Sequence, residues 1–275
     1  TATNTVTNTI SVGVGPNRPA VTPDGSKVYV PNGTSGTVSV ISTATKTVIA
    51  TVSGVGDARH VAITPDGARA YLARANGNSI SVVSTSTNTV TSTIDVGGYS
   101  LGIAVTPNGN FAYVSVRVGS NGVVAVVDTN SASPTFNTVV ATIQVGALSG
   151  GNISSVAVTP DGSRAYVVNN NSNAVHVINT ANNTLLTTLS GVGGDPQSIA
   201  ITPDGAKAYV TSPFNTVRIR DTNPASPTYH TEIGSMTLGS GAYGIAITPA
   251  DTTPPAAPAG LAKISPDNNP LPAFR

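Results

Sequence analysis

A short motif recurs six times along the chain and divides it into repeats. Its clearest copy is Val-Ala-Ile-Thr-Pro-Asp-Gly at 61–67, and its prolines are spaced by 42, 42, 53, 43 and 46 residues. Those prolines are Pro23, Pro65, Pro107, Pro160, Pro203 and Pro249. Internal repetition at this period indicates one large repeat domain rather than two ordinary domains, although the chain has 275 residues.

Each copy of the motif predicts a buried strand followed by a tight turn. Alanine stands two residues before the threonine in all six copies, and Val or Ile follows it each time. Such a small apolar run is typical of a strand covered on both faces. Pro-Asp-Gly then supplies the turn, because Pro fixes φ, Asp bonds its own backbone and Gly accepts positive φ. We therefore interpret Asp24, Asp66, Asp161 and Asp204 as turn formers rather than catalysts.

Three further strands are predicted in each repeat. The second carries a tyrosine in constant register, which we expect to pack between repeats. Asn/Gly-rich turns lead to the third strand, and a Thr-rich turn leads to the outer one. The five tyrosines are Tyr29, Tyr71, Tyr113, Tyr166 and Tyr209.

These patterns predict an all-β fold, a β-propeller of four-stranded antiparallel blades with a repeat of about 42 residues. There are five complete repeats, an orphan outer strand at 3–12 and an orphan inner strand at 243–248. We predict six blades with an irregular closing blade, in which the N-terminal strand latches the ring. Five or seven blades are the alternatives.

The chain divides into the propeller at 1–250 and a tail at 251–275 that holds six of the twenty prolines. We interpret the tail as a Pro-rich linker or as the start of a following Ig-like or fibronectin-III-like domain. The competing hypothesis is that Gly260-Leu-Ala-Lys-Ile264 completes the sixth blade or pairs with another copy of the chain.

Composition excludes some partners. Only 9% of the residues are charged and the net charge is +1, so no basic field is available for nucleic acid. No apolar run approaches the roughly 20 residues that a membrane helix needs. The polar but weakly charged composition favours an extracellular or cell-surface location, whereas the absence of cysteines excludes disulfides without fixing the compartment.

The unit resembles the YVTN-family β-propeller repeat. The resemblance rests on Tyr166-Val-Val-Asn169 and on the Thr-Pro-Asp-Gly turn, and it covers about 3–250. Several copies are degenerate, for instance Tyr71-Leu-Ala-Arg74. Proteins similar to this occur in surface layers and as cell-surface or secreted proteins, so the resemblance implies a surface role.

The mouth of the central channel is the expected site on this scaffold. Connectors from each outer strand to the next inner strand gather there, and their residues vary while the strands repeat. The alternative interpretation is that these connectors are solvated loops whose residues vary without serving a function. The candidate binding residues are Arg18, Asp57, Arg59, His60, Tyr99, Asn152, Asp195, Gln197 and Tyr243.

Two kinds of chemistry are conceivable at this mouth. A histidine beside carboxylates could perform acid–base work, which points to His60 with Arg59 and Asp195. Asp57, Asn152 and Asp195 could hold Ca²⁺ through oxygen ligands. No spacing motif supports either, so polar surface residues with loose ion pairs are the simpler interpretation, without a metal or other cofactor.

Catalytic motifs of hydrolases, zincins and nucleotide-binding proteins are missing from the sequence. Propeller lactonases, which the repeat resembles in fold, typically use a channel metal site that includes Glu. The sole glutamate, Glu232, falls in an outer strand, and this argues against a close relationship with them.

Two near-identical loops, 128–136 and 221–229, extend the rim opposite the mouth. Each presents one ring, Phe136 or Tyr229, for a partner, or else folds it back over its own loop.

We predict a non-enzymatic module that binds protein or glycan, or has a structural role, at the cell surface. A lactonase-like or lyase-like enzyme with a site at the mouth is one alternative. The other is a subunit that self-associates through the incomplete blade into a surface layer or filament.

Overall fold

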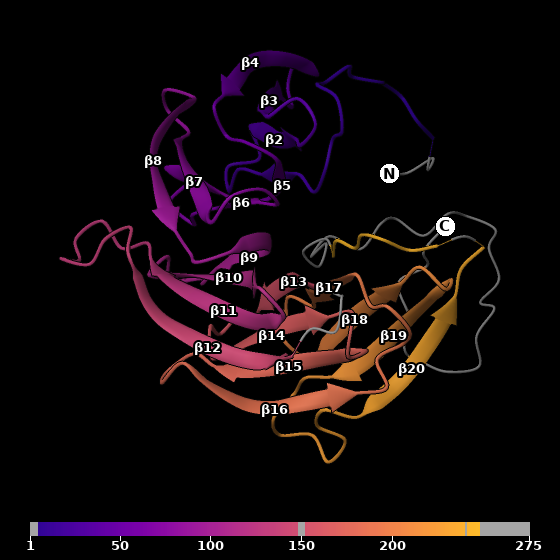
Figure 1. Ribbon diagram of the computed structural model, residues 1–275. Helices are drawn as coiled ribbons and strands as arrows, with labels where there is room; N and C mark the ends of the chain where they lie inside the picture. Colours follow the sequence, from indigo (N-terminus) through magenta and orange to yellow (C-terminus); the bar gives the residue numbers. More distant parts are fainter. Residues whose placement is uncertain (1–4, 148–151, 240, 248–275) are drawn as a thin grey trace.

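The computed structural model describes residues 5–147, 152–239 and 241–247. In this part of the chain all regular structure is β: twenty strands form five four-stranded sheets, arranged around a common centre (Figure 1). No helix long and apolar enough to cross a membrane occurs among the described residues. The prediction of an all-β propeller with four-stranded antiparallel blades is confirmed.

Each sheet follows chain order from the innermost to the outermost strand. Blade 1 contains β1 (Ala20–Val21), β2 (Lys27–Asn32), β3 (Thr37–Ser42) and β4 (Thr47–Ser53). Blade 2 contains β5 (Ala58–Ile63), β6 (Arg69–Arg74), β7 (Ser79–Ser84) and β8 (Thr89–Asp95). Blade 3 contains β9 (Tyr99–Val105), β10 (Phe111–Val118), β11 (Asn121–Asp128) and β12 (Val139–Ala147). Blade 4 contains β13 (Ile153–Val158), β14 (Arg164–Asn169), β15 (Ala174–Asn179) and β16 (Thr184–Ser190), and blade 5 contains β17 (Ser198–Ile201), β18 (Lys207–Ser212), β19 (Thr216–Asp221) and β20 (Glu232–Thr237).

The hydrophobic core lies between blades rather than within them. Four clusters of buried Val, Ile, Leu, Ala and Tyr side chains each join two consecutive blades, from blades 1 and 2 to blades 4 and 5. The tyrosines of the second strands in blades 1 to 4 are fully buried in these clusters. Their expected role as packing elements between blades is confirmed.

The same tyrosines also form a polar joint with the next blade. The hydroxyl of Tyr29 donates to Oδ1 of Asn88 over 2.7 Å, and those of Tyr71 and Tyr113 bond the side chains of Asn137 and Asn183 in the same way. Each of these asparagines has a positive φ between 55° and 58°, a conformation that Asn adopts more readily than most residues. The fourth joint pairs Tyr166 with His230, which also has positive φ.

The Pro-Asp-Gly turns form as the sequence predicts. In the second copy the hydroxyl of Thr64 donates to Asp66 Oδ1 over 2.5 Å, and the amide of Ala68 donates to the same oxygen over 2.9 Å. These bonds, that of Thr64 first, lower the pKa of the Asp66 carboxyl, so the carboxylate is stabilised in its own turn. The turn glycine faces the proline of the preceding blade: a Cβ added at Gly67 would lie 3.6 Å from Cδ of Pro23.

Blades 1 and 5 are not paired with each other in the described part of the chain. Gly25 has no proline beside it, and no core cluster joins these two blades. Segments 5–12 and 241–247 lie on this side of the ring (Figure 1), outside any strand.

The strands expected at 3–12 and 243–248 are therefore not formed in their described parts, 5–12 and 243–247. The reason is that neither segment has a middle strand beside it to complete a ladder. Five complete blades are described, and the expected sixth has no described strand. The tail at 251–275 lies outside the described residues.

Candidate functional site

A cavity of about 570 Å³ lies at the centre of the ring. Inner-strand residues of all five blades line it, together with Gly244, Ile245 and Ala246. The repeated alanines at 20, 62 and 104 leave this space open, because a methyl group takes up little of it. Most of the wall is apolar, and its polar side chains are those of Arg18, His60, Ser155 and Ser198.

These polar residues occupy one position of the repeat, two residues before the alanine that recurs in every copy of the motif. Five of the six residues at that position line the cavity, and the sixth, Gly102, has no side chain. Alternate residues of a strand point to the same side, so the position projects toward the channel as the alanine does. The residues are Arg18, His60, Gly102, Ser155, Ser198 and Gly244.

Arg18 crosses from blade 1 to the opposite side of the ring. Its guanidinium donates to the carbonyl oxygen of Ser154 over 3.2 Å and to that of Gln197 over 2.7 Å. Its backbone forms a parallel bridge with His60 of blade 2. Burial lowers the pKa of Arg18, yet a guanidinium keeps its proton. No carboxylate is among the described residues that line the cavity, so this cation has no counter-ion there.

His60 is held neutral next to that cation. Burial, and secondly the charge of Arg18, lower the pKa of His60 to about 3. Its Nδ1 accepts a hydrogen bond from the backbone amide of Ile103 at 3.3 Å, so the ring proton is on Nε2. His60 therefore serves as a hydrogen-bond donor and is a poor general base at neutral pH.

The other predicted mouth residues form local contacts of their own. Arg59 and Asp57 make an ion pair at 2.7 Å, with the Arg59 side chain 44% exposed. Gln197 donates to Asp195 Oδ1 over 2.7 Å. Oδ1 of Asn152 accepts a hydrogen bond from the guanidinium of Arg117 at 3.5 Å, and the backbone amide of Asn152 donates to Oδ1 of Asn170 over 2.7 Å.

The proposed calcium ligands Asp57, Asn152 and Asp195 are thus each engaged in a different connector, and the described contacts do not bring them together. Among the described residues no group of three or more His, Asp or Glu could hold a metal ion. Tyr99 and Tyr243 are 52% and 65% exposed and do not line the cavity.

The two rim rings fold back toward the preceding blade. The guanidinium of Arg69, in blade 2, lies 4.8 Å from the ring centre of Phe136. Tyr229 stacks on His230 with ring centres 3.7 Å apart. Both rings are half-buried, so little of either is presented to a partner.

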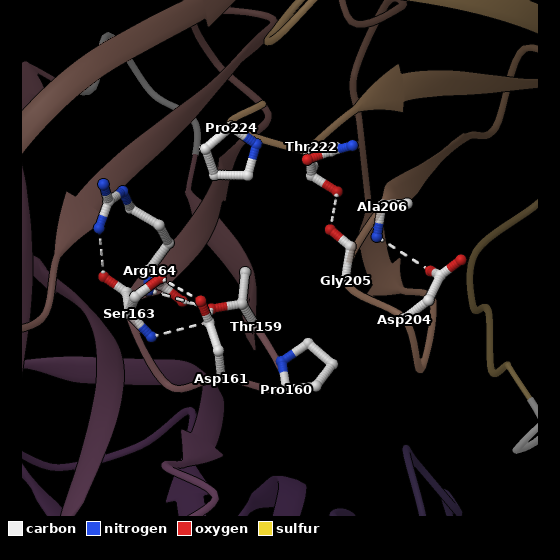
Figure 2. Close-up of a pocket in the computed structure, with 11 residues that line it drawn as sticks. Thr159, Pro160, Asp161, Ser163, Arg164, Asp204, Gly205, Ala206, Thr222 and Pro224 are labelled. Carbon is white, nitrogen blue, oxygen red and sulfur yellow. Dashed lines mark hydrogen bonds between the residues drawn. The ribbon is translucent and has the colours of Figure 1, made fainter. Parts of the chain in front are cut away.

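Smaller pockets repeat between successive blades on the face that carries the Pro-Asp-Gly turns. The one between blades 4 and 5 has a volume of about 210 Å³ (Figure 2). Figure 2 shows that Asp161 bonds Ser163 within its own turn, whereas Thr222 donates to the carbonyl oxygen of Gly205 in the neighbouring turn. Because similar pockets occur between blades 1 and 2 and between blades 2 and 3, they follow from the repeat geometry. The central cavity is the stronger candidate.

The repeats of this chain match a known protein family. The model of the lactonase, seven-bladed beta-propeller family matches residues 19–190. The chain belongs to this lactonase family. The chain is a member of this family although no glutamate lines the central cavity among the described residues.

Several solved structures are similar to this lactonase-family chain, and one of the three described below is a beta-propeller domain. A functionally unknown protein from Desulfotomaculum acetoxidans is 27% identical with a TM-score of 0.70, over 83% of this chain and 72% of that one. Kuenenia stuttgartiensis hydrazine synthase is 24% identical with a TM-score of 0.68, over 79% of this chain and 66% of that one. The Cps50 (Swd1) beta-propeller domain of Myceliophteria thermophila is 12% identical with a TM-score of 0.68, over 85% and 74%.

The search of curated proteins gave no significant match. This lactonase-family chain spans just under two thirds of the hydrazine synthase chain, and the likeness to that protein and to Cps50 shows the fold alone. The comparisons support a β-propeller of the lactonase family, whereas the YVTN and surface-layer assignment stays a prediction.

Sequence reasoning missed Ser155, Ser198 and Ile103 as parts of the site. The signal that could have found the serines is their place two residues before the repeated alanine. Ile103 contributes a backbone amide, which no side-chain pattern reveals.

Proposed function

We propose that the central cavity binds a small organic anion and that the protein acts there as a lactonase-like hydrolase. The observation that carries the proposal is the cation of Arg18, which lines a cavity without a carboxylate among its described residues. Removing a charge from water is costly unless it is paired, so an anionic ligand is favoured next to it.

The donors at this site suit a carboxylate or a developing oxyanion. A guanidinium has five N–H donors, and two of its nitrogen atoms already serve Ser154 and Gln197. The remaining N–H groups of Arg18 and the Nε2–H of neutral His60 are donors for the ligand, in addition to the hydroxyls of Ser155 and Ser198 in the same wall. Aligned donors of this kind stabilise the charge that develops on a carbonyl oxygen.

The reaction proposed is the hydrolysis of a lactone that bears a carboxylate. Water adds to the ring carbonyl carbon, the C–O bond of the ring breaks, and the ring oxygen takes a proton, which gives a hydroxy acid. The product loses a proton to solvent and becomes a carboxylate. The support for hydrolysis is membership of the lactonase family, and the support for an anionic substrate is Arg18.

The experiment measures lactone opening by base uptake at constant pH, with neutral and carboxylate-bearing lactones of equal ring size. We expect turnover of the charged lactones, and its loss in Arg18→Gln and His60→Gln. Arg59→Gln, at the mouth but outside the cavity, is the matched control. Rates equal to those of buffer for every lactone, with no binding of the hydroxy acids by calorimetry, would refute the proposal.

A binding module without catalysis is the second candidate. It is favoured by the protonation state of His60, since no general base lines the cavity among the described residues. Binding of a hydroxy acid without turnover of its lactone would support this candidate. A cell-surface setting with a protein or glycan partner remains part of this proposal, and secretion of the full-length protein by its host would test it.

Self-association is a third candidate, and the unpaired side of the ring favours it. Among the described residues Tyr209 lacks the hydroxyl joint that Tyr29, Tyr71, Tyr113 and Tyr166 form, and Gly25 lacks the neighbouring proline that the other turn glycines face. The expected result is a solution mass that rises with concentration, measured by light scattering. A mass that stays at one chain throughout contradicts this candidate.

A further inference from the structure

The wall of the central cavity has a polar end and an apolar end. Consecutive residues of the inner strands line it, and they form three levels that follow one another from the channel mouth toward the Pro-Asp-Gly turns. The first level holds all the polar side chains of the wall, Arg18, His60, Ser155 and Ser198. The second level consists of Pro, Val and Ile, and the third of the alanines Ala20, Ala62, Ala104 and Ala246.

Hydrogen bonds fix the charge of the cavity at the mouth end. The guanidinium of Arg18 donates to the carbonyl oxygens of Ser154 and Gln197, and these residues directly precede Ser155 and Ser198 of the first level. The guanidinium therefore lies across this level, where it meets blades 4 and 5. His60 is held in the same level by the backbone amide of Ile103, which donates to its Nδ1. A negatively charged group of a ligand is thus favoured at the mouth end alone.

The other two levels offer only apolar contacts. Val61 and Ile103 of the second level are 2% and 1% exposed, whereas Ala62 and Ala104 of the third keep more of their surface accessible. Their small side chains leave space in which an alkyl group can replace water. Two residues separate the first level from the third along each strand, which corresponds to about 6.6 Å at about 3.3 Å per residue. The apolar surface therefore begins beside the charge and continues away from it.

We propose that the ligand of this cavity is an amphipathic anion, with its carboxylate beside Arg18 at the mouth and an alkyl chain that extends along the alanines. The inference rests on the proposed function, because it takes the anion site as given, and it names the substrate class. The substrates are lactones and hydroxy acids that carry an alkyl chain in addition to the carboxylate. Polyhydroxy acids of equal charge are rejected, since their hydroxyls would lose water at the apolar levels without gaining a partner.

Calorimetry with a series of straight-chain carboxylates tests this proposal on the full chain. The probes are acetate, butanoate, hexanoate and octanoate, and the weaker acids are measured by displacement of octanoate. We expect the dissociation constant to fall about two- to fourfold for each added methylene group that enters the apolar levels. Gluconate, which has the same charge but a hydroxylated chain, should bind no more tightly than acetate.

A double variant locates the chain within the cavity. Ala62→Ser combined with Ala104→Ser adds two hydroxyls to the third level, so it should weaken hexanoate binding about three- to tenfold and leave acetate binding unchanged. Ala200→Ser is the matched control, because Ala200 has the same place in the repeat but is not among the residues that line the cavity. Acetate binding also shows whether the double variant is folded, and the series with the parent protein decides if it is not.

The outcomes separate this inference from the proposed function. Equal affinity for all four acids, or gluconate bound as tightly as hexanoate, overturns the amphipathic ligand and leaves the anion site at Arg18 intact. Hexanamide, the uncharged counterpart of hexanoate, should bind more weakly, and Arg18→Gln should abolish this difference. If hexanamide and hexanoate bind the parent protein equally, the proposed anion site is refuted and only the apolar levels stand. Absence of binding by every probe overturns both proposals.

Discussion

Arg18 and Gln197 lie 179 positions apart in the sequence, and the guanidinium of the first donates to the carbonyl oxygen of the second over 2.7 Å. The bond joins blade 1 to blade 5, which share no strand pairing among the described residues. The same side chain reaches Ser154 of the connector before β13. Arg18 therefore has two roles, as a cross-link through the channel and as the cation of the proposed site.

Replacing Arg18 should destabilise the ring. Arg18→Gln removes two bonds from a charged donor, so the free energy of unfolding should fall by about 1–3 kcal/mol in urea titrations. Arg18→Lys should cost less, because it keeps the charge but not the two-pronged geometry. Arg59→Gln breaks an exposed pair worth about 0–1 kcal/mol and is the control. Equal losses in Arg18→Gln and Arg59→Gln would show that the cross-link does not form.

The tyrosine joints predict a graded series of hydroxyl deletions. Tyr71→Phe and Tyr113→Phe each leave an asparagine oxygen without its donor, so each should lower the free energy of unfolding by about 0.5–1.5 kcal/mol. Tyr209→Phe should change it little, since Tyr209 makes no such joint among the described residues. Chemical denaturation of the three variants checks the series. A loss at Tyr209 as large as the others would show that its hydroxyl has a partner after all.

Local rules predicted the strands and turns, because the residues that form them are adjacent in the sequence. The Thr-Pro-Asp-Gly turn satisfies its own aspartate within five residues, so one copy of the motif contains all the information. The joints could not be predicted in this way, since Tyr29 and Asn88 are 59 residues apart and meet only when two blades pack.

The candidate site was predicted only in part, because local sequence shows which residues stand near an inner strand but not which of them face the channel. Arg18 and His60 stood out as charged or titratable residues at the start of an inner strand, and both line the cavity. Asp57 and Asp195 stood out equally, yet each pairs with a residue two positions away in its own connector. Proximity in the repeat does not distinguish a side chain that points into the channel from one that bonds beside it, whereas strand alternation does.

The turn aspartates predict an acid-sensitive ring. Hydrogen bonds from the turn, that of Thr22 first, lower the pKa of Asp24 to about 2, and the carboxyls of Asp66, Asp161 and Asp204 are shifted in the same direction. A lowered native pKa means that the stabilisation is present above about pH 4 and is lost as the pH falls through the native values. The melting temperature should therefore drop in that window.

Replacing the aspartates of these four turns by asparagine should reduce the fall of the melting temperature at acid pH. Asn108 already fills the role in blade 3, where it accepts bonds from Thr106 and from the amide of Asn110. The exposed turns individually contribute little, so the quadruple variant is the informative one. Scanning calorimetry from neutral to acid pH compares it with the parent. If the melting temperature of the variant falls with pH as steeply as that of the parent, the loss of stability in acid belongs to other carboxyls, such as Asp128 and Asp221.

Gly102 lies where the inner strands β9 and β13 leave no room for a side chain, and it gives a direct packing test. A Cβ at this position would lie 2.5 Å from the carbonyl oxygen of Ser154 and 2.9 Å from Cα of Ser155, and neither backbone atom can move without displacing β13. Gly102→Ala should therefore cost about 1–3 kcal/mol of unfolding free energy, as overpacking does. Since β13 carries Ser155 of the cavity wall, binding of a hydroxy acid should weaken as well.

The control for Gly102→Ala is Gly239→Ala, at an exposed position where an added Cβ meets no atom within 4 Å. It should leave both unfolding and ligand binding unchanged. If Gly102→Ala unfolds like this control, blades 3 and 4 are further apart than described and the cavity is wider. If Gly102→Ala lowers the free energy of unfolding but leaves ligand binding unchanged, the close packing of β9 and β13 is supported, and the site does not depend on the position of β13.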